Sequence, residues 1–216
     1  MSKILDVDLQ RYIDANTTAP DQVMQDLAAE TRDALDNRAG MQIGVDQARF
    51  MTMLVQTANA KTAVEIGTFT GMSSLAIARG LAPGGTLTCF DVSDEYTAIA
   101  RRYWERDGVS DRITLVLGDA REETAKLPSE PHIDFAFIDA DKSGYATYWD
   151  NLVPRMKPGG LIAIDNVLQR GRVVNDDSDN ETVVAIRAFN SKTIADSRVD
   201  QVMLGMRDGV TLARKR

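Results

Sequence analysis

Hydrophobic residues in the first 60 positions recur at the three- and four-residue spacing of amphipathic helices. Residues 23–35 show this spacing and are followed by Gly40, a helix-stop residue, and residues 46–59 repeat it. The earliest positions with this spacing are Leu5, Leu9, Tyr12 and Ile13. We therefore predict a helical segment over residues 1–60.

From residue 61 the pattern becomes a regular alternation of short apolar runs and longer amphipathic segments. The predicted strands are 63–66, 86–90, 113–117, 133–138, 161–164, 198–204 and 210–214, and the predicted helices are 73–79, 95–106, 120–127, 145–153 and 181–194. Such alternation predicts a mostly parallel sheet with helices on both faces. Asp208-Gly209 between the last two strands is typical of a hairpin. We expect one α/β domain over residues 1–216, with seven strands and a C-terminal antiparallel hairpin.

Composition narrows the classes of protein. The chain has 216 residues, 44% of them hydrophobic and 26% charged, as in ordinary globular proteins. Its net charge is −7 and its one basic run is residues 214–216, which disfavours nucleic-acid binding. No apolar run approaches the roughly 20 residues of a membrane span, and residues 1–6 lack the apolar region of a signal peptide. We expect a cytoplasmic protein without a membrane partner.

Oxygen-bearing side chains follow two of the predicted buried strands. Asp139 comes directly after 133–138, and Asp165 and Asn166 come after 161–164. The carboxyl ends of parallel strands share one edge of a sheet, where ligands bind. Carboxylate and amide oxygens suit magnesium, calcium or manganese, so we expect a cation site there. The alternative is that these residues cap loops.

A lysine follows the first of these strand ends and is a candidate general base. Lys142 lies three residues after Asp139, and a cation nearby would disfavour its ammonium form, so that the neutral amine could accept a proton. The alternative is a surface lysine paired with Asp141. We expect Asp141 itself to position Lys142 or to cap the next helix rather than to bind metal.

A glycine loop joins the first strand of the α/β part to its helix. Gly67 and Gly71 have G-x-x-x-G spacing, with Glu65 two positions before. A nicotinamide site would read G-x-G-x-x-G, so the spacing argues against a nicotinamide-dependent oxidoreductase. Mixed polar contacts suit a ligand with an amino acid end. The alternative is a plain turn in which the glycines serve backbone geometry.

Two further strand ends suggest a nucleoside. Asp91 ends the second strand and can accept hydrogen bonds from ribose hydroxyls, although it could instead cap the next helix. Residues 118–120, Gly-Asp-Ala, would let an adenine ring lie against the backbone at the end of the third strand. A nucleoside and an amino acid without pyrophosphate describe S-adenosylmethionine.

Together these motifs resemble those of the cation-dependent class I O-methyltransferases, the catechol and caffeoyl-CoA O-methyltransferase family, and are closer to its bacterial branch. The resemblance covers about residues 40–214, and its most specific parts are residues 137–145 and 165–173. It implies a Rossmann-like fold, a homodimer, and a helical part at 1–60 that serves as a cap or in dimerisation over a cofactor-binding core at 61–216. It also implies methyl transfer from S-adenosylmethionine, with S-adenosylhomocysteine as product, to a small phenol with vicinal hydroxyls that chelate the cation.

The resemblance also implies a role for each site residue. Asp139, Asp165 and Asn166 would hold Mg²⁺ or another divalent cation, and the catalytic residues would be Lys142, as the general base, and Asp139. The residues that would bind S-adenosylmethionine are Ile43, Glu65, Gly67, Thr68, Ser73, Asp91, Ala120 and Asp139.

The chain departs from the family pattern where an acceptor would lie. Residues 204–209 read Leu-Gly-Met-Arg-Asp-Gly where the family often has Leu-Pro-x-Gly-Asp-Gly, and Gln169 and Arg170 stand where plant enzymes carry Trp and Asn. Arg170 and Arg172 could favour an acidic phenol, or could be solvated loop residues. The plant enzymes' N-terminal lysine that contacts coenzyme A has no match here, so we do not expect a thioester. A tRNA hydroxyuridine methyltransferase is an alternative that the acidic balance disfavours.

Overall fold

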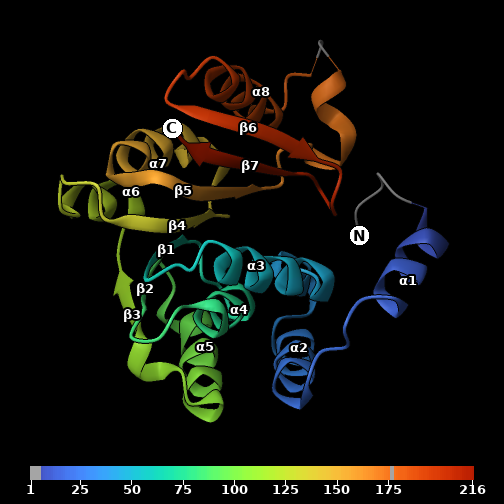
Figure 1. Cartoon of the computed structure of the whole chain (residues 1–216). Helices are drawn as coiled ribbons and strands as arrows, with labels where there is room; N and C mark the ends of the chain where they lie inside the picture. Colours follow the sequence, from blue (N-terminus) through green and yellow to red (C-terminus); the bar gives the residue numbers. More distant parts are fainter. Residues whose placement is uncertain (1–5, 176–177) are drawn as a thin grey trace.

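A single seven-stranded sheet forms the centre of the molecule, with helices on both faces (Figure 1). The computed structural model describes residues 6–175 and 178–216, so the expected helical position of Leu5 lies outside the described residues. The strands are β1 (Thr62–Ile66), β2 (Thr86–Asp91), β3 (Ile113–Leu117), β4 (Ile133–Ile138), β5 (Met156–Asp165), β6 (Val199–Leu204) and β7 (Val210–Lys215). Their order is β3-β2-β1-β4-β5-β7-β6. Strands β1–β5 run parallel, and β7 is antiparallel to β5 and β6, which confirms the predicted fold.

The helices bury two separate hydrophobic cores, one against each face of the sheet. The helices are α1 (Val7–Ala15), α2 (Gln22–Leu35), α3 (Val45–Thr57), α4 (Met72–Gly80), α5 (Asp94–Asp107), α6 (Ala120–Glu123), α7 (Tyr145–Leu152) and α8 (Glu181–Ile194). Helices α2–α5 contribute to one core, and α6–α8 to the other. The strands between them are apolar on both faces, as strands of a parallel sheet must be. Among the described residues every helix is too short or too polar to cross a bilayer.

Several predicted boundaries were wrong. The segment 120–127 is only the four-residue α6 followed by a 3-10 turn at Thr124–Lys126. Helix α2 ends at Leu35, well before Gly40, because Asp36 reverses the chain with a φ of 33°. Strand β5 begins at Met156, because a register shift in its pairing with β4 accommodates the Pro158–Gly160 segment. Residues Gln169–Val174, which we left without a predicted element, form short 3-10 turns.

The strand order sets the position of the site. The chain starts at β1 and moves outward to β2 and β3, and then crosses back to β4 and β5 on the other side. Loops at the carboxyl ends of β1 and β4 therefore diverge to opposite faces and leave a crevice, which is where open α/β sheets bind ligands. The predicted strand-end residues all lie along this edge.

Candidate active site

A cavity of about 1,380 Å³ opens over the carboxyl ends of the parallel strands. Every predicted site residue except Glu65 lines it. These residues are Ile43, Gly67, Thr68, Ser73, Asp91, Ala120, Asp139, Lys142, Asp165 and Asn166. Residues separated by more than 120 positions in the chain are thus brought to one concave surface, because five strands end at the same edge.

The glycine loop is shaped by close packing of the protein on itself. Gly67 has a φ of 89°, and a Cβ atom there would overlap the carbonyl oxygen of Asp139. The Asp139 N–H donates to the Ile66 carbonyl oxygen at 2.8 Å. Gly71 has a φ of 90°, and a Cβ there would lie 2.6 Å from the Ala100 Cβ. Both glycines therefore serve backbone geometry, and Gly67 in particular brings β1 and β4 together at the cavity floor.

Asp91 holds the same loop from the neighbouring strand. Its Oδ2 accepts hydrogen bonds from the N–H groups of Thr68 and Phe69 at 2.9 and 2.8 Å, and its Oδ1 accepts from the Ser93 N–H at 2.8 Å. Ser93 rather than Asp91 caps α5, because its hydroxyl accepts from the Tyr96 N–H. Asp91 therefore fixes the glycine loop while its carboxylate also borders the cavity.

Glu65 lies beneath the cavity rather than in its wall. The side chain is fully buried, and neither carboxylate oxygen has a hydrogen-bond partner within residues 6–175 and 178–216. Burial raises the pKa of Glu65 to about 7, although the nearby Ser73, Cys89 and Thr68 side chains lower it somewhat. Desolvation without a partner favours the neutral acid. A cationic group bound above Glu65 would reverse that preference.

The ends of β4 and β5 bring two carboxylates and a lysine together. Lys142 Nζ donates to Asp139 Oδ1 at 2.9 Å and to the Tyr145 hydroxyl oxygen at 2.6 Å. The Tyr145 hydroxyl donates to the backbone carbonyl of Asp165 at 3.0 Å. Asp165 is 2% exposed, and burial, followed by the charge of Asp139, raises the pKa of its carboxyl group. Two carboxylates that repel each other in a dry site are suited to a cation.

The donor set available to a cation is small and consists of oxygen atoms. No group of three or more His, Cys, Asp and Glu side chains within residues 6–175 and 178–216 could hold a metal. A cation here would rely on Asp139, Asp165 and the amide oxygen of Asn166. Asn166 has a φ of 56°, and its N–H donates to Asp165 Oδ1 at 2.7 Å, so the two residues form one compact turn. Carboxylate and amide oxygens with room for further ligands suit magnesium.

Two further site residues were missed from the sequence. Gln47 on α3 is 2% exposed, lies against the Asp165 carboxyl group and lowers its pKa, and its Nε2 atom has no partner among the described residues. Tyr145, which fixes Lys142, is fully buried. Tyr145 lies within the 137–145 motif, which was a usable signal, whereas Gln47 has no such signal, because other polar residues such as Asp46 and Arg49 lie beside it on α3.

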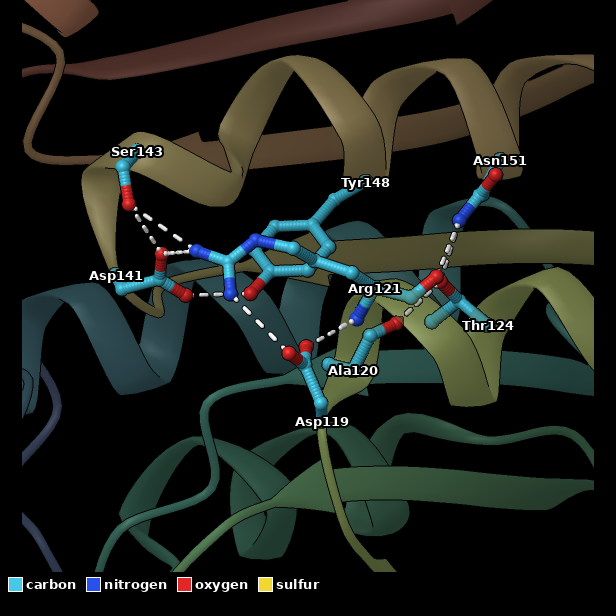
Figure 2. Close-up of polar contacts among 8 residues, drawn as sticks. All are labelled: Asp119, Ala120, Arg121, Thr124, Asp141, Ser143, Tyr148 and Asn151. Atoms are coloured by element: carbon cyan, nitrogen blue, oxygen red, sulfur yellow. Dashed lines mark hydrogen bonds and ion pairs between the residues drawn. The ribbon is translucent and has the colours of Figure 1, made fainter.

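A polar network joins the residues that follow β3 to those that follow β4, at the wall of the cavity (Figure 2). The Arg121 guanidinium pairs with Asp141 and with Asp119, and donates to the Ser143 hydroxyl at 3.1 Å. Tyr148 donates to the second oxygen of Asp141. Asp141 stands at the N-cap of the 3-10 turn Lys142–Gly144 without a side-chain cap hydrogen bond, and Lys142 donates to Asp139 and Tyr145 instead. Our preference for Asp141 as a positioning or capping residue rather than a metal ligand stays a prediction. Arg121 comes from α6, 20 positions before Asp141 in the sequence.

Comparisons with known proteins point to one family. A family model described as O-methyltransferase matches residues 14–216. The chain is 43% identical over 174 residues, 79% of this chain and 76% of the relative, to "Probable caffeoyl-CoA O-methyltransferase 1" of Dictyostelium discoideum. It is 34% identical to a caffeoyl-CoA O-methyltransferase of Populus kitakamiensis, over 96% of this chain and 93% of the relative. An O-methyltransferase from Bacillus cereus in complex with SAH superposes with a TM-score of 0.88 at 29% identity, over 97% of both chains.

Replacing Glu65 by Gln should flatten the pH dependence of the stability of the unliganded protein. An unfolded glutamate loses its proton near pH 4.5 and folded Glu65 near pH 7. The free energy of unfolding of the wild type therefore falls as pH rises through this window, by about 3 kcal/mol from this group. The Gln variant lacks that part of the fall.

Urea unfolding at pH 4.5 to 7.5 measures this difference. Glu122→Gln, on the exposed face of α6, is the matched control and should keep the slope of the wild type. Equal slopes in the wild type and in Glu65→Gln would contradict the assignment of Glu65 as a buried neutral acid.

Proposed function

The chain belongs to the O-methyltransferase family, and from this membership we propose that it transfers the methyl group of S-adenosylmethionine to a hydroxyl of a vicinal diphenol, with a divalent cation bound beside the acceptor. One observation carries the proposal. Lys142, Asp139 and Asp165 lie together at the ends of β4 and β5, and they share one cavity with the Gly67 loop. A cofactor site and a deprotonating site are thus adjacent. Family membership sets the oxidoreductase alternative aside.

The cofactor would occupy the part of the cavity over β1–β3. Thr68, Ser73 and Ile43 would surround its amino acid end, Asp91 would accept from the ribose, and Ala120 would border the adenine. The Bacillus cereus relative, described in complex with SAH, supports this ligand class. Glu65 beneath the loop would be ionised by the cationic cofactor, because a positive charge above a buried carboxyl group favours the carboxylate.

The cation would be held by Asp139, Asp165 and Asn166, and Mg²⁺ fits this oxygen-only set. When bound, it would orient the two hydroxyls of the acceptor and lower the pKa of one of them. In its absence Lys142 neutralises Asp139. A cation would take over that role and leave the lysine amine free to turn to the acceptor.

The residues of the chain would then move one proton and align two reactants. The acceptor hydroxyl gives its proton to Lys142 Nζ, and its oxygen forms a bond to the methyl carbon while the bond from that carbon to sulfur breaks. Tyr145 holds Nζ at 2.6 Å and is itself fixed by the Asp165 carbonyl. Much of the rate should come from holding both reactants in line in one cavity.

Removal of the cation should abolish methylation without loss of cofactor binding. Asp165→Ala, or excess EDTA with the wild type, should stop methylation of 3,4-dihydroxycinnamic acid and its methyl ester, while calorimetry still detects S-adenosylhomocysteine. Asp150→Ala, at a surface ion pair with Lys192, is the control and should keep full activity. Total tRNA is the second acceptor in the assay. Full activity in EDTA would contradict the proposed dependence on a cation. Methylation of tRNA alone would favour the hydroxyuridine alternative.

Loss of the base should lower turnover rather than binding. Lys142→Ala should reduce kcat by roughly 10²–10⁴-fold, the range of positioned acid–base groups, while KM for S-adenosylmethionine changes little. Lys126→Ala removes a surface lysine that pairs with Glu123 and serves as the control. Raising the pH should restore part of the activity of Lys142→Ala, because hydroxide can then remove the proton. Unchanged turnover would contradict the assignment of Lys142 as the general base.

We also propose that the chain forms a homodimer through its unpaired apolar surfaces. Helix α1 buries none of its residues and exposes Val7, Leu9 and Tyr12. In Figure 1 this helix lies at the edge of the molecule, and Gln10 and Asp14 join it to Asp46 and Arg207. The edge strand β6 also exposes Val202 and Met203. Sedimentation equilibrium should give twice the mass of the chain, and a monomer would contradict the proposal.

A further inference from the structure

Two arginines at the loop after β5 have no acidic partner within the described part of the chain. Arg170 and Arg172 line the cavity and have exposed side chains. Within residues 6–175 and 178–216, neither guanidinium forms an ion pair with a carboxylate. Arg207, which lines the same end, pairs with Asp46 and Asp14. In a chain of net charge −7, two unneutralised arginines at a binding cavity call for an anionic ligand.

The loop that carries them is held in a strained backbone conformation. Asn166, Gln169 and Arg170 have φ values of 56°, 47° and 58°, which residues other than glycine rarely adopt. The turn of the β6–β7 hairpin enforces this shape, because the Asp208 carbonyl accepts from the Leu168 N–H at 3.0 Å and the Asp208 carboxylate accepts from the Arg170 N–H. Such strain persists where the surroundings over-determine the backbone, most often at ligand sites.

A chain of hydrogen bonds links Arg172 to the cation end of the cavity. Gln169 is 5% exposed, and its Nε2 donates to the Asn166 carbonyl at 2.8 Å. Arg172 Nε donates to the Gln169 carbonyl at 3.1 Å. Gln169 therefore links the Arg172 guanidinium to Asn166, which is a candidate cation ligand. The Nη1 atom of Arg172 remains available for a bound ligand. Asp208 lines this end too, and its Oδ1 accepts a hydrogen bond from the Arg170 N–H rather than from the guanidinium.

We propose that Arg170 and Arg172 form an anion-binding subsite for a carboxylate on the acceptor, which makes the substrate class a vicinal diphenol that bears a carboxylic acid. This inference rests on the proposed function. The guanidinium fork matches carboxylate geometry and binds it through paired, charge-assisted hydrogen bonds. The Arg170 side chain forms no hydrogen bond with the residues that the structure describes and could reach the ligand, while Arg172 is held by Gln169.

The test compares two acceptors of the same shape and different charge. 3,4-Dihydroxycinnamic acid and its methyl ester carry the same ring, and the ester is neutral. The double variant Arg170→Asn, Arg172→Gln removes both charges, while Asn tolerates the left-handed backbone at position 170 and Gln keeps a donor for the Gln169 carbonyl. Arg101→Gln, which breaks a surface pair with Asp94, is the matched control.

The wild type and Arg101→Gln should prefer the acid on the order of 10-fold in kcat/KM, the effect of about one charged hydrogen bond. The double variant should lose this preference through a raised KM for the acid, with the ester unchanged. Salt should weaken the preference in the wild type, because the arginines are exposed. Equal use of acid and ester by the wild type, or a retained preference in the double variant, overturns the proposal.

Two further measurements separate this inference from the proposed function. Calorimetry in the presence of S-adenosylhomocysteine and Mg²⁺ compares the affinities of the acid and the ester without turnover. If neither compound is methylated, tighter binding of the acid to the wild type alone still supports the subsite, equal binding overturns it, and the absent turnover counts against the diphenol reaction. A coenzyme A thioester of the acid is a third acceptor. If it is methylated with a higher kcat/KM than the free acid, and the double variant loses that advantage, the subsite binds phosphate and the carboxylate proposal is overturned.

Discussion

The close approach of Gly67 to the carbonyl of Asp139 is the contact on which the rest of the site depends. Only a residue without Cβ lets the end of β1 pass so near the end of β4. The glycine loop and the residues that follow β4 thereby become two walls of one cavity. A methyl transfer between two bound molecules needs that adjacency, since its rate depends on holding both in line. Asp91, which ties the same loop to β2, fixes the first wall against the second.

Buried carboxyl groups are the second organising feature. Glu65 is fully buried without a hydrogen-bond partner among the described residues, and Asp165 is buried near Asp139, so that the pKa values of Glu65 and Asp165 are both raised in the unliganded protein. Such groups reduce stability as the pH rises, and they become favourable only beside positive charge. The cationic cofactor and a divalent cation would supply that charge. Binding and stability should therefore be coupled in this enzyme, as is common where sites carry unsatisfied polar groups.

The cavity has two parts, one whose residues match the family pattern and one whose residues depart from it. The segments over β1–β4 match the family pattern, and the relatives are named as caffeoyl-CoA O-methyltransferases or bind SAH. The departures are Gln169, Arg170 and residues 204–209, in the loop after β5 and in the hairpin turn that holds it. The strained backbone and the arginines therefore lie at the end of the cavity where we propose that the acceptor binds. Specificity in enzymes that share a fold and a cofactor resides in such loops rather than in the sheet.

Much of the fold and of the candidate site could be predicted from the sequence, because the sequence signals for them are local. Apolar runs placed the ends of β1, β2, β4 and β5 and thus named Gly67, Asp91, Asp139 and Asp165 as neighbours along one edge. Boundaries failed where pairing decided them, as at Met156, which enters β5 because β4 accommodates the extra residues through a register shift.

The partners of the polar side chains were decided only by the tertiary structure. Asp141 turns to Arg121 instead of Lys142, Gln47 reaches Asp165 from α3, and Arg207 is neutralised by Asp46 and Asp14 while Arg170 is not. Hydrophobic spacing reports which face of an element is buried, and it carries no information about which distant charge lies opposite. The edge of the sheet where the site residues lie was therefore determined by the sequence alone. The pairing of charges, in which Arg170 and Arg172 have no acidic partner within the described part of the chain, was decided when separate elements packed together.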